Sequence, residues 1–167
     1  MAKYVYKVGL SPKAIQSVID KLTFITANSY AFNQVFLKVS LDFIESRAVY
    51  YIEQSVGSFS TGELESGFRK YIKDNVGELV NTVFYAALVE YGTGVKGMGT
   101  HPLPKDYQYD VNGHGEEGWN YVVDGRVFHT TGMEAHRFMF NALQDYLRVQ
   151  HKFFDMIIEQ HMRGSGI

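Results

Sequence analysis

The stretch that decides the fold is SYAFNQVFLKVSLDFIESRAVYYIEQS, residues 29–55, which is apolar on two sides at helical spacing. Narrow polar seams separate two stripes that lie on nearly opposite sides of a helix turning 100° per residue. One stripe consists of Phe32, Val35, Phe36, Val39, Phe43 and Tyr50, and the other of Leu37, Leu41, Ile44, Ala48 and Tyr51. Such a helix must bury both sides. One side can cover a sheet, and the other needs a second helix or another subunit; the pattern does not choose between these.

Two more helices are predicted, one before and one after this stretch. Ser11 and Pro12 suit the N-cap and the first position of a helix over residues 12–25. A long amphipathic helix is predicted from about Glu134 to His161, with Leu143, Leu147 and Phe154 extending one flank of its core stripe. That core stripe consists of Ala135, Phe138, Ala142, Tyr146, Val149, Phe153 and Ile157.

Between the long helices the pattern shortens to that of strands. Strands are expected over 67–73 and 78–85, joined by a turn at 75–77. A clearer hairpin pairs 119–123 with 126–130 through Asp124-Gly125, and its Trp119, Tyr121 and Val123 side is expected to face the core. The fold class is therefore α+β: one domain over residues 1–167, with a small antiparallel sheet packed against the N-terminal helices and a long C-terminal helix.

A glycine-rich stretch over residues 92–118 separates the two strand pairs. It holds seven glycines and two of the chain's three prolines. Long segments without regular structure in a compact domain tend to be mobile or functional. We expect a flexible loop here.

Composition excludes several function classes. The net charge is -2 without a basic tract, which gives no argument for tight nucleic-acid binding. Cysteine is absent, which removes thiolate catalysis, disulfides and cysteine metal sites. The longest apolar runs are too short for a membrane span, and the first residues lack the apolar core of a signal peptide.

Motifs that could carry chemistry are weak. Residues 92–97 match G-x-G-x-x-G, but Met98 to Pro102 cannot open the helix that a dinucleotide site needs. The six histidines (His101, His114, His129, His136, His151 and His161) are scattered and are interpreted as surface residues. The acid pairs at 63/65 and 116/117 have polar surroundings that would not raise a pKa. No catalytic residue, cofactor site or metal site is predicted.

Two segments resemble a known family. Residues 85–94, YAALVEYGTG, and 132–143, GMEAHRFMFNAL, resemble in that order the tail-component family of tailed bacteriophages, which includes tail-completion proteins. The family carries Y-A-x-x-V-E-aromatic-G-T-G and later G-M-x-A-x-P-F-hydrophobic-x-x-A-L. Residues 61–68, TGELESGF, are similar to the family's T-G-x-L-x-x-S lead into the first strand. Arg137 stands where the family has proline.

The motif positions are interpreted mainly as fold determinants with a possible interface role. Gly92 and Gly94 are expected to take positive φ, and Gly132 to end the hairpin before the last helix. Glu90 is the exception to test, because it is a charge inside an apolar run. The full set of these positions is Tyr85, Glu90, Tyr91, Gly92, Gly94, Gly132, Ala135, Phe138 and Ala142.

The resemblance implies a structural virion protein of the neck or tail, active in tail completion and head–tail joining. It implies a homo-oligomer, a hexameric ring in the virion, placed between the head-closure (connector) protein and the tail tube or tail terminator protein. DNA would be passing cargo only, with no membrane involved, and assembly would occur in the host bacterial cytoplasm.

Two alternatives remain open from the sequence. One is a tail terminator or other minor virion component, which the fold-determining residues cannot separate from the first interpretation. The other is a small metal-dependent or nucleotide-using enzyme built on the glycine–histidine loop.

Overall fold

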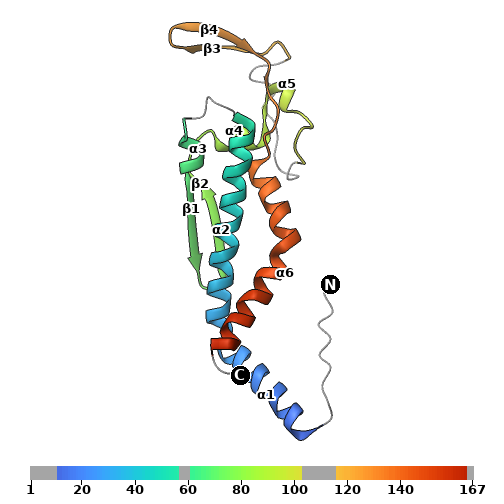
Figure 1. Ribbon diagram of the computed structural model, residues 1–167. Coiled ribbons are helices and arrows are strands. Elements are labelled where there is room, and N and C mark those ends of the chain that lie inside the picture. Colours follow the sequence, from blue (N-terminus) through green and yellow to red (C-terminus); the bar gives the residue numbers. More distant parts are fainter. Residues whose placement is uncertain (1–10, 57–60, 103–115, 165–167) are drawn as a thin grey trace.

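The computed structural model describes residues 11–56, 61–102 and 116–164. Its central feature is a pair of long helices, α2 (Ser29–Val56) and α6 (Phe138–Gly164), that lie side by side (Figure 1). The other elements are α1 (Pro12–Ala27), α3 (Glu63–Ser66), β1 (Phe68–Lys73), β2 (Val76–Asn81), α4 (Ala86–Tyr91), α5 (Gly94–Gly97), β3 (Trp119–Val123), β4 (Arg126–Thr130) and β5 (Gly132–Met133). This mixture of helices and antiparallel hairpins confirms the predicted α+β class.

Both apolar sides of α2 are covered within the chain. The ring of Phe43 packs against Phe153 of α6, with 5.2 Å between ring centroids. On the other side β2 lies so close that a Cβ on Gly77 would stand 3.2 Å from the side chains of both Leu37 and Leu41. The sequence left open whether the side of α2 away from the sheet meets a second helix or another subunit. In the structure it meets a second helix, and most of both stripes is covered within the chain. Val35 and Tyr50 of the first stripe stay 36% and 42% exposed.

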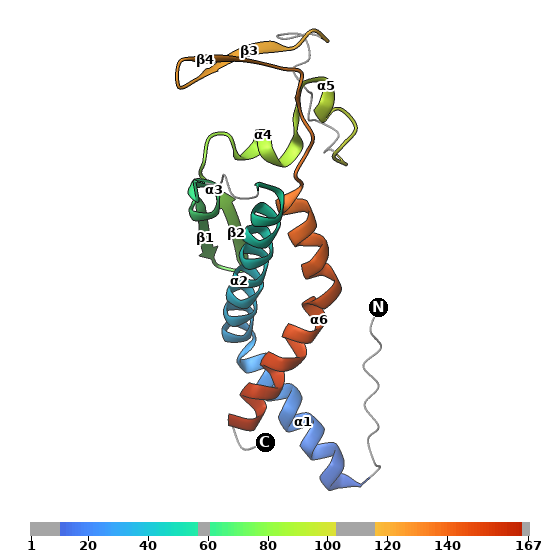
Figure 2. The same cartoon turned by 45° about the horizontal axis from the view of Figure 1, so that its top comes forward.

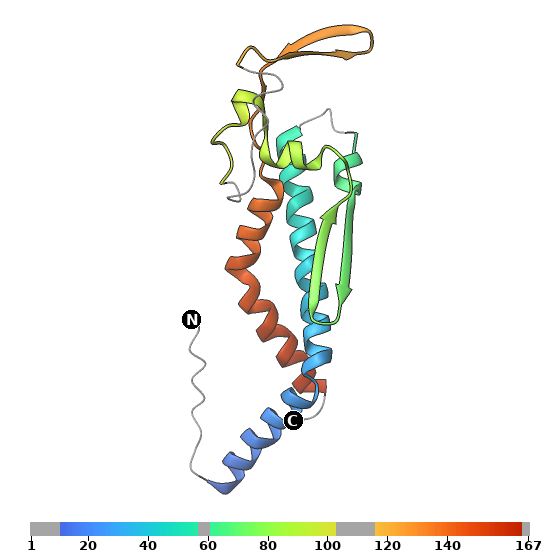
Figure 3. The same cartoon turned by 180° about the vertical axis from the view of Figure 1, so that it is seen from behind.

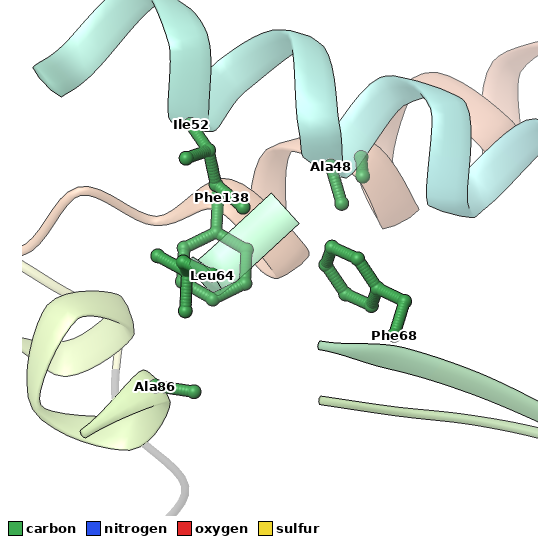
Figure 4. Packing of buried hydrophobic residues seen from close by; sticks show 7 residues of the cluster. Ala48, Ile52, Leu64, Phe68, Ala86 and Phe138 are labelled. Carbon is green, nitrogen blue, oxygen red and sulfur yellow. The ribbon is translucent and has the colours of Figure 1, made fainter. Parts of the chain in front are cut away.

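The core lies where α2, α6 and the short elements meet, at one end of the helix pair (Figure 4). Phe138, 1% exposed, packs edge-on against Phe68 of β1 at 6.2 Å. Leu64 of α3 and Ile52 of α2 close the cluster. Burying a side chain of this size stabilises a fold by about 1.5–3 kcal/mol, so the first residue of α6 is one of its main anchors.

A charged group joins the two long helices farther along α6 from this core. Asp145 Oδ2 accepts hydrogen bonds from Arg47 Nε at 2.8 Å and from the Tyr51 hydroxyl at 2.9 Å. Burial by itself would raise the pKa of Asp145. The hydrogen bonds from Tyr51 and Arg47, with the Arg47 charge, outweigh burial and hold that pKa below its ordinary value.

Replacing Asp145 with asparagine is expected to change how stability depends on pH. A carboxyl whose pKa is lower in the folded chain contributes stability above its unfolded pKa, about 3.9, and loses it as pH falls through the folded pKa. Asp145→Asn should therefore cost about 1 kcal/mol at neutral pH and flatten the fall of the melting temperature below about pH 4. Asp20→Asn, on exposed α1, is the control. An unchanged acid profile in Asp145→Asn would contradict this.

The first strand pair forms an antiparallel hairpin on one side of α2 (Figure 3). Its second strand spans Val76–Asn81 rather than the predicted 78–85, and its turn is Asp74-Asn75 rather than 75–77. Asp74 takes φ 54°, a turn conformation that aspartate tolerates well. The predicted strand was too long because the apolar run from Val83 onward is used for the helix α4 instead.

The second strand pair forms a separate sheet, so the single small sheet expected from the sequence is wrong. β3 and β4 project from the end of the helix pair as an arm, defined here as residues 119–130 (Figures 1 and 2). Tyr121 is 43% and Val123 48% exposed, so the expectation that this face lies on the core is also wrong. Alternation identifies a face, but it does not show that anything covers it.

Helix α1 runs away from the body at the opposite end and has no buried residue (Figure 1). Ser11 Oγ accepts from the Ala14 amide, which confirms the predicted N-cap. The last helix begins at Phe138, four residues later than predicted. Its flank residues Leu143, Leu147 and Phe154 are exposed. None of the helices described here is both long and apolar enough to cross a bilayer.

Candidate functional site

The candidate site is the junction where the end of α4 meets the start of α6. Glu90, the charge singled out in an apolar run, lies there and is 6% exposed. Its Oε2 accepts from the Met139 amide at 2.8 Å, and its Oε1 accepts from the Phe140 amide at 2.9 Å. These are amides of the first turn of α6, which have no partner inside their own helix. Glu90 therefore caps α6 from another element, where a carboxylate also complements the helix dipole.

His101 completes this arrangement. Its Nε2 lies 2.9 Å from Glu90 Oε1, and its ring packs edge-on against Tyr91 and Phe140 at 4.7 and 5.3 Å. His101 is 7% exposed, so its interpretation as a surface histidine is wrong. Its Nδ1 is buried without a hydrogen-bond partner. The sequence signal was too weak to find this pair, because a lone histidine eleven residues downstream in a glycine-rich stretch matches no motif.

The glycines of the two motifs let the backbones meet. Thr93 bridges Met133, and Gly94 bridges Gly132. Gly92, Gly94 and Gly132 take φ of 80°, 60° and 109°, which confirms the expected positive φ of the first two. A Cβ on Gly132 would lie 1.9 Å from the Thr93 carbonyl oxygen. These positions therefore need glycine twice over, for conformation and for space.

Further hydrogen bonds join the chain segments that meet at this junction. The His136 amide donates to the Val89 carbonyl at 2.9 Å, and the Ala135 amide donates to Thr100 Oγ1 at 2.9 Å. Burial lowers the pKa of His136, which favours its neutral form. The chain from 97 to 101 thus lies against the segment that leads into α6.

The remaining motif positions divide into core and periphery. Phe138 and Ala142 are buried in the main cluster, and Tyr91 contacts His101. Ala135 precedes α6 and is not part of the helical stripe to which it was assigned. Tyr85 lies outside the strand predicted for it, as the residue before α4, and donates to Glu63 at 3.0 Å. Burial and the neighbouring Glu63 raise the pKa of Tyr85.

Arg137 stands where the resembling family has proline, and its backbone explains why proline does not fit here. Its φ is 55°, whereas proline is held near -65°. Its amide donates to the Glu90 carbonyl at 3.2 Å, a bond that proline cannot make. The backbone at this position therefore has no place for proline.

Arg137→Pro is expected to destabilise the protein by about 3 kcal/mol or more, through the forbidden φ and the lost hydrogen bond. Arg137→Gly is the matched control. It should stay within about 1 kcal/mol of the natural chain, because glycine takes positive φ freely and keeps the amide. Chemical denaturation of both variants measures the difference. Equal stability of the two would contradict this account of the helix entry.

The carboxylate of Glu90 serves as a helix cap. Two backbone amides donate to it, and the His101 ring lies within hydrogen-bonding distance. The G-x-G-x-x-G match at residues 92–97 follows the helix α4 rather than a strand, and its own last four residues form α5, which is a single turn. In the described ranges there is no group of three or more histidine and acidic side chains that could hold a metal ion. His114 and the rest of 103–115 lie outside those ranges.

Comparison with known proteins finds no matching family model, no matching curated protein and no matching solved structure.

Proposed function

We propose that this chain is a structural virion protein of a tailed bacteriophage, acting in the neck or tail in tail completion and head–tail joining. One observation carries the proposal. The two segments that resemble the tail-component family, about forty residues apart in sequence, form a single junction through the Gly94–Gly132 bridge and the Glu90 cap. Residues that resemble a family by chance have no reason to meet in space.

The junction supports a role based on shape. It joins the helix pair to the projecting arm and holds both by backbone contacts that leave no room for a side chain at Gly132. A ring protein needs subunits with a rigid body and surfaces that reach neighbours. In the virion we place this chain as a hexameric ring between the head-closure protein and the tail tube or tail terminator, with DNA passing through the ring unbound.

Disruption of the gene in the phage genome tests the proposal. Loss of a joining protein should leave filled heads and finished tails that stay separate, and purified protein added to the lysate should restore joined particles. Electron microscopy of the lysate measures both. Complete infectious virions from a clean deletion would refute it.

The same lysates distinguish a joining protein from a tail terminator. Without a tail terminator nothing stops growth of the tube, so tails of uncontrolled length would accumulate instead of tails of normal length. A metal-dependent enzyme would instead show bound metal by elemental analysis of the purified protein.

A further inference from the structure

We propose that the arm of one copy docks on the α4 end of a second copy, through two surfaces that this chain leaves open. The inference rests on the proposed ring and names the contact that would build it. The first surface is the aromatic face of the arm, which consists of Tyr121, Val123, Arg126 and Phe128. The second is the α4 patch, which consists of Phe84, Leu88 and Glu63.

The aromatic face of the arm has the features of a binding surface without its partner. By the strand register, Tyr121 lies opposite Phe128 and Val123 opposite Arg126, so these four side chains share one face. The two aromatic rings stack at 5.6 Å and remain 43% and 42% exposed. An isolated two-stranded hairpin is marginally stable in water, so an exposed aromatic face on one indicates a missing partner. Tyrosine, phenylalanine and arginine are the types that interfaces favour.

The α4 patch has the complementary character. Phe84, two residues before α4, is 89% exposed, the highest value among the large hydrophobic residues of the described chain, and Leu88 in α4 is 46% exposed. The ring of Phe84 packs on Tyr85, and the Tyr85 hydroxyl donates to Glu63, so apolar and acidic groups are contiguous here. An aromatic face with a cation would thus meet an apolar patch with a carboxylate, and Arg126 would pair with Glu63.

The arm cannot easily reach the α4 patch of its own chain. A Cβ on Gly94 would lie 2.3 Å from the Thr131 carbonyl oxygen, and one on Gly118 would lie 2.1 Å from the Thr130 carbonyl oxygen. Backbone packing this close at the base fixes the arm across the end of the helix pair (Figures 1 and 3). In that position it does not cover the α4 patch of its own chain, because Phe84 stays 89% exposed and Tyr121 and Phe128 stay 43% and 42% exposed. A second copy is therefore the occupant. A contact between two different surfaces of one chain is heterologous, which is the kind that closes into rings.

The size of the contact decides how to detect it. Together, the exposed parts of Tyr121 and Phe128 could bury on the order of 150 Å² of surface, taking about 200 Å² for one fully buried aromatic side chain. That is far below the roughly 800 Å² per partner of a stable interface. A single contact will thus be weak, and a ring gains from closing several at once. Covalent trapping is the suitable assay.

The chain has no cysteine, so engineered cysteines report contacts without background. The double variant Phe84→Cys with Phe128→Cys, oxidised at high protein concentration, should give a ladder of disulfide-linked oligomers. Each single variant should give at most dimers, and a mixture of the two single variants should give the mixed dimer in preference to either homodimer. The matched control pairs Tyr71→Cys, 54% exposed on β1, with Phe128→Cys and should give no ladder.

Charge reversal supplies a second test, which does not depend on any effect that the cysteine substitutions have by themselves. Arg126→Glu in the double-cysteine chain should lower the ladder yield about tenfold, and adding Glu63→Lys should restore it. Unchanged melting temperatures verify that the variants are folded. A disulfide within one chain, dimers only, or no ladder from a folded double variant would each overturn the arm contact. None of these results tests the proposed role in the virion, which the deletion lysates test separately.

Discussion

Glu90→Ala is expected to destabilise the protein by about 3 kcal/mol, since the change removes the shared hydrogen-bonding partner of two backbone amides and a buried imidazole at once. The Met139 and Phe140 amides and the His101 ring would lose their common partner. Glu90 is only 6% exposed, so bulk solvent is a poor replacement for the lost partner. For a chain of this length the melting temperature should fall by roughly 6–12 °C.

The matched control is Glu90→Gln, which keeps the size of the side chain and one acceptor oxygen while removing the charge. It should lose about half as much, because its carbonyl can still accept from one amide of the first turn of α6. Thermal unfolding followed by circular dichroism measures both variants. Equal melting temperatures for Glu90→Ala and the natural chain would show that α6 is not capped by this residue.

Gly132→Ala should be as damaging as the loss of Glu90 or more so, by about 3–5 kcal/mol. The added methyl would lie 1.9 Å from the Thr93 oxygen and 2.5 Å from the Thr93 carbonyl carbon, and both are backbone atoms that cannot rotate away. Its φ of 109° adds a conformational cost of roughly 1–2 kcal/mol for any residue with a side chain. The bridges between the two motif segments would have to open.

Gly99→Ala isolates the conformational part of this cost. Gly99 also has positive φ, 71°, but a Cβ there would have no atom within 4 Å. We expect a loss of about 1 kcal/mol, from the backbone alone. Urea unfolding of the two variants gives the difference directly. If Gly132→Ala were no worse than Gly99→Ala, the close approach of the two segments would not contribute to stability.

Local periodicity predicted the helices well. Residues 29–55 form α2 almost residue for residue, and Ser11-Pro12 starts α1, because spacing along a helix and N-cap chemistry depend only on near neighbours. The tight turn at Asp124-Gly125 was found for the same reason. The end of the first strand pair was predicted wrongly. The apolar run from Val83 to Val89 suits a strand or a buried helix equally well. Only its packing against the cluster that contains Phe138 and Ile52 decides which of the two forms.

The candidate site was only half visible from the sequence. Glu90 stood out as a charge among apolar residues, and the glycines showed where the backbone would need positive φ. That Glu90 would cap a helix beginning at Phe138, and would take His101 as its third partner, could not be inferred, since these residues are far apart in the chain and no local rule links them.

The amino-acid sequence by itself therefore determined which segments form the three long helices, where the Asp124-Gly125 turn lies and which positions need glycine, because short-range sterics and hydrogen bonding decide these. Only the tertiary structure decided what each apolar face meets. It placed α6 and β2 on the two sides of α2, and it left the arm uncovered. The same alternation of apolar residues serves a buried and an exposed face, and the difference lies in which distant segment packs there.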